Sequence, residues 1–170
     1  MSDPYTRFTQ ARLMATGSSL GIDPPNLAPK CGTESDLKSL ISAYYNFYNE
    51  RLAKERSFLL GLRPTPQLEQ LRQLIYNLRT ADEHSDNTRA EAKAVQWRRQ
   101  FGTPQDAADT LAASLTQGLE LLGNIAAAVA RDSGLAAQWR QLLAVDVGTV
   151  FSAVAYDLGL SFREGDRRRM

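Results

Sequence analysis

Hydrophobic residues recur every three or four positions along most of this chain, a spacing that predicts amphipathic α-helices. Proline, glycine and helix-capping residues divide the pattern into five expected helices, at 34–61, 66–78, 88–101, 104–132 and 135–158. No segment alternates apolar and polar residues as a half-buried strand would. We therefore expect an all-α fold, an antiparallel bundle of about five helices with short connections.

Residues that favour helix starts support these limits. Thr33 or Ser35 can cap the first helix, Thr65 precedes a proline at the start of the second, Asp86 or Asn87 can cap the third, and Thr103 precedes a proline at the start of the fourth.

The two ends of the chain depart from the pattern. Glycines and prolines interrupt residues 1–33, so we expect an irregular N-terminal arm, in which Tyr5 to Met14 could form a helical turn or two. Residues 34–160 then form one helical bundle domain, and residues 161–170 a charged tail.

Composition narrows the chemistry. Lys and Arg number 20 against 19 Asp and Glu, a net charge of +1, so any contact with nucleic acid is expected to be local. Cys31 is the only cysteine and His84 the only histidine, which excludes an intrachain disulfide and argues against a protein-only transition-metal site. We expect no cofactor, no secretion signal, no membrane span and a cytoplasmic location.

The segment from Arg79 to His84 carries the main candidate chemistry. Histidine can take up and release a proton near neutral pH, and arginine offers a planar fork of donors that matches phosphate oxygens. Two other uses of a single histidine fit less well. Glu-x-x-His, which a di-iron bundle needs, is absent because Ala81 stands three residues before His84. The residues after His84 also differ from those of histidine phosphotransfer domains.

An all-α chain with Arg-x4-His between two long helices resembles the HEPN superfamily, whose members include toxin–antitoxin and antiviral defence ribonucleases. The resemblance implies that Arg79 and His84 form the active pair of a homodimer that cleaves single-stranded RNA without a metal. His84 would transfer the proton while the 2′-hydroxyl attacks, and Arg79 would stabilise charge on the phosphate. Thr80 would support the site, and an antitoxin or another defence protein would be a partner.

Acidic residues within the motif favour a second hypothesis. Asp82 and Glu83 place two carboxylates beside the expected phosphate site, and carboxylates repel RNA. A non-enzymatic helical interaction module, or an inactive HEPN-like subunit of a larger defence complex, therefore remains an alternative. In that case His84 is a polar residue at a helix end.

Helical geometry places a condition on the active pair. Five residues advance about 500° around an α-helix, so Arg79 and His84 would lie roughly 140° apart on a straight helix. They can act together only if the helix ends or bends between them, or if two protomers each contribute one part.

The helix expected at 88–101 is the most basic of the chain. We interpret its cations either as a solvated face or as an RNA-binding surface beside the motif. These candidate RNA-binding residues are Arg89, Lys93, Arg98 and Arg99. The tyrosines at 44, 45 and 48 have the spacing of a buried helix face, which favours a core position over base stacking.

Overall fold

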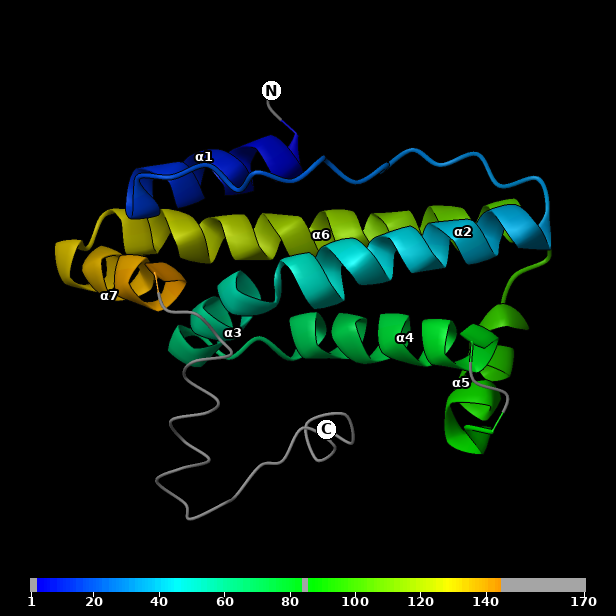
Figure 1. Ribbon diagram of the computed structural model, residues 1–170. Helices are drawn as coiled ribbons and strands as arrows, with labels where there is room; N and C mark the ends of the chain where they lie inside the picture. Colours follow the sequence, from blue (N-terminus) through cyan, green and yellow to red (C-terminus); the bar gives the residue numbers. More distant parts are fainter. Residues whose placement is uncertain (1–2, 84–85, 145–170) are drawn as a thin grey trace, which may run out of the picture.

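The computed structural model describes residues 3–83 and 86–144, and within these ranges the chain is all-helical, without a strand (Figure 1). The helices are α1 (Pro4–Thr16), α2 (Glu34–Tyr44), α3 (Ala53–Leu62), α4 (Pro66–Glu83), α5 (Thr88–Arg98), α6 (Pro104–Ala130) and α7 (Ser133–Ala144), with a π-helical segment, η1 (Tyr45–Arg51), between α2 and α3.

The all-α class is confirmed, but the arrangement differs from the antiparallel five-helix bundle that the sequence suggested. In Figure 1, α1, α2 and α6 run in the same direction and α4 runs against them. The first expected helix is divided into α2, η1 and α3. The last is described only as α7, and its expected continuation to residue 158 and the tail 161–170 lie outside the described residues.

Helix α1 is longer than the helical turn or two expected between Tyr5 and Met14 of the N-terminal arm. Asp3 caps it by accepting a hydrogen bond from the amide of Thr6 (3.1 Å), and the hydrogen bonds from Thr6 lower the pKa of Asp3. Gly17 ends the helix in the left-handed conformation (φ 74°). Phe8 is fully buried against α6, and this tertiary contact explains why the segment's own weak periodicity did not predict a full helix.

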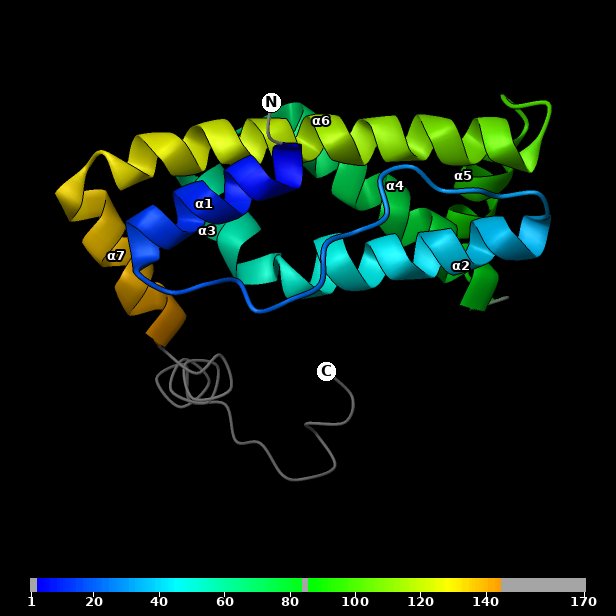
Figure 2. The same ribbon diagram turned by 90° about the horizontal axis from the view of Figure 1, so that it is seen from above.

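Residues 17–32 have no regular structure and cross from α1 to α2 along one side of α6 (Figure 2). Side chains from α1, α2 and α6 hold their backbone in place. The hydroxyls of Tyr5 and Tyr44 donate to the carbonyls of Ile22 (2.8 Å) and Asn26 (2.7 Å). The amide of Gln105 donates to the carbonyl of Pro29 (3.0 Å) and accepts from the amide of Cys31 (2.7 Å). Hydrogen bonds from side chains therefore fix this segment, in place of the backbone hydrogen bonds of a helix or a strand.

The longest helix, α6, is the centre of the core and contacts α1, α2, α3, α4 and α7. Small residues let its neighbours approach closely. A Cβ atom at Gly123 would lie 3.6 Å from the backbone of Phe8 in α1. A Cβ atom at Gly118 would lie 3.0 Å from Leu71 in α4, closer than side chains normally pack. At the far end of α6, α7 joins α3 through Trp139, which stacks on Phe58 with 5.4 Å between ring centroids.

The π-helical segment η1 divides the expected first helix. The amide of Leu52 donates to the carbonyl of Phe47, five residues earlier (3.0 Å). The buried guanidinium of Arg56 donates to the carbonyls of Tyr48 (3.4 Å) and Asn49 (3.2 Å), which the wider turn leaves available. The sequence pattern did not reveal this break, because apolar residues continue at three- and four-residue spacing across it.

A buried ion pair joins α1 to α3. The guanidinium of Arg12 contacts Oε1 of Glu55 through two nitrogens, both at 3.1 Å, and the two side chains are only 7% and 5% exposed. A third nitrogen of Arg12 donates to the carbonyl of Ser18 (2.7 Å). Because the charges are desolvated, the loss of one partner leaves the other without compensation.

We predict that Glu55→Gln destabilises the protein by about 3 kcal/mol or more, because it leaves the buried charge of Arg12 unpaired. Urea-induced unfolding measures the change. The matched control is Glu120→Gln, since Glu120 pairs with Arg7 of α1 at 3.5 Å on the surface, and we expect a change below about 1 kcal/mol. Equal effects of the two substitutions would contradict a structural role for the buried pair.

Candidate functional site

Helix α4 carries the motif and extends five residues beyond Leu78, to Glu83. Arg79 and Thr80 therefore lie within its last turns. The helix is regular through Asp82 and Glu83, and Asp86 is in a turn, so the described residues show no break between Arg79 and the residue before His84. His84 itself lies outside the described residues.

The Arg79 side chain already has two partners. Its guanidinium carbon lies 4.2 Å from the centroid of the Tyr45 ring, an arrangement in which the cation faces the electron-rich ring. Its Nη2 atom lies 3.0 Å from Oε2 of Glu83, one turn further along α4. The side chain remains 26% exposed, so solvent or a ligand can still reach part of it.

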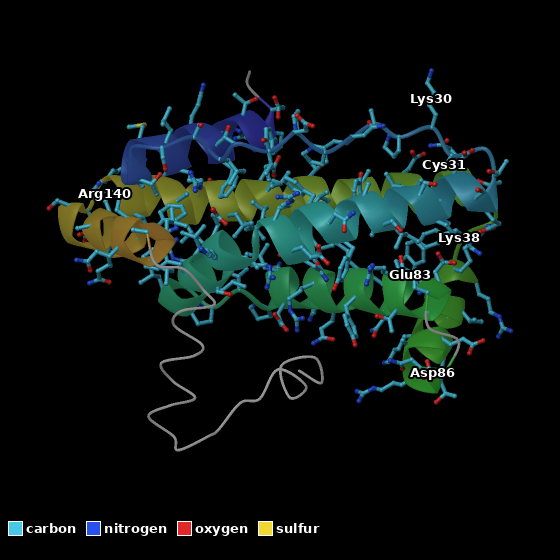
Figure 3. The ribbon with its side chains drawn as sticks, in the orientation of Figure 1. Lys30, Cys31, Lys38, Glu83, Asp86 and Arg140 are labelled. Atoms are coloured by element: carbon cyan, nitrogen blue, oxygen red, sulfur yellow. The ribbon has the colours of Figure 1, made fainter. Side chains whose placement is uncertain are left out.

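The other motif residues have different surroundings. Thr80 is 5% exposed and faces the interior, which fits a packing role as well as the expected support of a site. Asp82 pairs with Lys38 of α2 at 3.1 Å. Lys38 and Glu83 lie at the same end of the molecule, where α2 and α4 are neighbours (Figure 3). One of the two carboxylates that interrupt the motif is thus matched by a lysine from another helix.

The four candidate RNA-binding residues of α5 do not form one surface. Arg98 bonds to both carboxylate oxygens of Glu34 and donates to the carbonyl of Phe101 (2.9 Å). The hydrogen bond with Arg98 lowers the pKa of Glu34 and raises that of Arg98. Arg99 lines a separate shallow pocket on the outer face of α5. Only Arg89 and Lys93 lie in the same depression.

That depression is a groove of about 1010 Å³ between α4 and α5, which we call the amide groove. Six side-chain amides line it, together with two cations, and a tyrosine that is 40% exposed. The amides are Gln70, Gln73, Asn77, Asn87, Gln96 and Gln100, the cations Arg89 and Lys93, and the aromatic residue Tyr76.

The structure separates Arg79 from the amide groove. Arg79 is not one of the residues that line the groove, although Tyr76, three positions earlier and about 60° away around α4, is. The guanidinium of Arg79 faces Tyr45 of η1, whereas the groove lies between α4 and α5.

Two features of this region were not predicted from the sequence. The contact of Tyr45 with Arg79 depends on η1, which places a residue of the first expected helix against α4. The amides at 70, 73 and 77 do share one helix face, and that polar stripe was a usable signal. The core prediction for the other tyrosines is confirmed, since Tyr44 and Tyr48 are 1% and 0% exposed and burial raises the pKa of both phenols.

Within residues 3–83 and 86–144, no group of three or more His, Cys, Asp or Glu side chains is arranged to hold a metal ion. None of the helices in the part of the chain that the structure describes has the length and apolar character needed to cross a membrane. No protein-family model, curated protein or solved structure matches the chain. The resemblance to the HEPN superfamily thus rests on the spacing of Arg79 and His84 and on the all-α class.

If the contact between Arg79 and Tyr45 helps to hold η1 against α4, the two residues must be energetically coupled. A double-mutant cycle with Arg79→Met and Tyr45→Leu is expected to give about 0.5–1 kcal/mol of coupling in urea unfolding. Tyr45→Phe keeps the ring and should preserve most of that coupling. A cycle that gives no coupling would show that Arg79 is free for another role.

Proposed function

We propose that this protein is a metal-independent endoribonuclease of the HEPN type, in which Arg79 and His84 act on single-stranded RNA. The observation that carries the proposal is the end of α4. The helix is described to Glu83 and the chain is in a turn by Asp86, so the partly exposed Arg79 lies in the last turns of the described helix, close in sequence to His84. The all-helical fold and the partial exposure of Arg79 agree with this proposal.

The proposed chemistry is an internal transfer at phosphorus. The ribose 2′-oxygen attacks the adjacent phosphate and loses its proton to His84, the bond from phosphorus to the 5′-oxygen breaks, and the leaving oxygen takes up a proton. The products are a 2′,3′-cyclic phosphate and a 5′-hydroxyl end. Arg79 stabilises the negative charge on the non-bridging phosphate oxygens. To do so, its guanidinium exchanges its ion pair with Glu83 for one with the phosphate. A homodimer would place two such motifs together.

A specific observation favours a second function. Arg79 is held between Tyr45 and Glu83, and Thr80 is buried, so packing alone accounts for both residues. The second candidate is therefore a non-enzymatic helical interaction module, in which the motif stabilises the end of α4. An antitoxin or a defence-complex protein would be its partner under either proposal.

Cleavage of a fluorescent single-stranded RNA in EDTA tests the nuclease proposal. We expect His84→Ala to slow cleavage by about 10²–10⁴-fold and Arg79→Ala by about 10²–10³-fold, because each removes a group that acts in the transition state. Arg63→Ala is the matched control, since Arg63 is exposed between α3 and α4 and is not a candidate RNA-binding residue, and it should leave the rate unchanged.

A substrate with one 2′-deoxyribose at the cleavage position should resist cutting there, because it lacks the attacking oxygen. Circular dichroism and mass measurement in solution establish that each variant is folded and of the same oligomeric state. Wild type and variants that are equally inactive, yet folded and alike in mass, would exclude the nuclease and leave the interaction module.

A further inference from the structure

The amide groove is a strongly polar depression, and the proposed nuclease chemistry does not use it. On α4 its lining runs from Pro66 to Asn77, eleven residues apart, which corresponds to a length of about 17 Å. An extended polypeptide of about five residues covers the same distance. The groove is therefore long enough for a short strand of another chain.

Charge within the groove is positive. Arg89 and Lys93 are exposed and stand one turn apart on α5. Glu69 is the one carboxylate of the lining, and Arg72 neutralises it by bonding to both of its oxygens, which lowers the pKa of Glu69. Among the residues that line this groove, the one carboxylate is therefore already paired with Arg72 and does not neutralise Arg89 or Lys93.

The spacing of the cations matches an extended acidic peptide. Residues four apart on an α-helix are separated by about 6 Å along the axis. In an extended chain, side chains two residues apart lie on one face and are separated by about 6.6–6.8 Å. Carboxylates at alternate positions of a bound strand would therefore reach Arg89 and Lys93 together.

The amides suit the backbone of such a strand. Each primary amide offers donors and an acceptor, and each peptide unit offers one of each. Gln70, Gln73 and Asn77 follow one another along α4 at three- and four-residue spacing, and Gln96 of α5 is followed by Gln100 in the turn after that helix. These side chains can replace the water that the peptide groups of a bound strand give up.

RNA fits this groove less well than a peptide does. Surfaces that hold single-stranded nucleic acid combine several cations with exposed aromatic rings on which bases stack. Here Tyr76 is the one lining ring with substantial exposure, at 40%, while Trp97 is 9% exposed and packs edge-on against Phe101. The net charge of +1 also provides little long-range attraction for a polyanion.

We propose that the amide groove binds an extended, acidic polypeptide segment of a partner protein. Arg89 and Lys93 bind its carboxylates, and the amides of α4 and α5 bind its backbone. Arg79 does not line this site, and the site does not depend on the proposed nuclease activity.

Fluorescence anisotropy with the full-length protein tests the proposal. The probe is a labelled twelve-residue peptide with glutamate at alternate positions in a glycine–serine background. Its controls are the same peptide with glutamine in place of glutamate and a labelled twelve-nucleotide oligouridylate. We expect the acidic peptide to bind at least about tenfold more tightly than the neutral peptide, because charged partners strengthen the hydrogen bonds.

Matched variants locate the site. Arg89→Gln combined with Lys93→Gln should weaken binding of the acidic peptide at least about tenfold, since it removes both carboxylate partners. Asn77→Ala should weaken both peptides by a similar factor, because it acts on the backbone. Arg99→Gln removes a charge just after the end of α5, outside the groove, and should have little effect.

Three results would overturn the proposal. The acidic peptide and its glutamine control could bind equally, or Arg99→Gln could weaken binding as much as the double variant does. The oligouridylate could instead bind, and lose affinity in the double variant, while the peptide does not; the groove would then be an RNA site. If His84→Ala loses cleavage but still binds the peptide, peptide binding is independent of the nuclease activity.

Discussion

Close approach to α6 is the constraint on which the rest of the fold depends. Gly118 and Gly123 are five residues apart, about 140° around the helix, so they admit α4 on one face and α1 on another. Two helices that run in opposite directions can therefore pack against one central helix without competing for space. Packing at this distance maximises dispersion contacts, and it also leaves little room for larger side chains at either position.

The π-helical segment connects this packing to the candidate chemistry. Tyr48 and Asn49 of η1 donate from their side chains to the carbonyls of Leu68 (3.0 Å) and Arg72 (3.1 Å), which fixes η1 against α4. Tyr45 belongs to the same segment, so the surroundings of Arg79 are set by an irregularity in a neighbouring helix. Irregular helical turns of this kind recur near functional sites, because they aim side chains in directions that a regular helix does not offer.

The sequence predicted those parts of the fold that depend on interactions between residues close together in the chain, such as helix caps. Thr103 caps α6 as expected, because a cap depends on three or four adjacent residues. The sequence did not predict the burial of Phe8, since the partner at Gly123 is far along the chain. The partner of Arg79 was missed for the same reason: nothing in residues near Arg79 indicates that Tyr45 would face it.

The pairing of Phe8 with Gly123 also fixes an order of events during synthesis. Helix α1 is translated before α6, and Gly123 of its docking surface follows Phe8 by 115 residues (123 − 8). At a translation rate of about 5–20 residues per second, α1 waits for roughly 6–23 s with its apolar face uncovered. During that interval α1 lacks its docking surface, so the core closes only after α6 has been made.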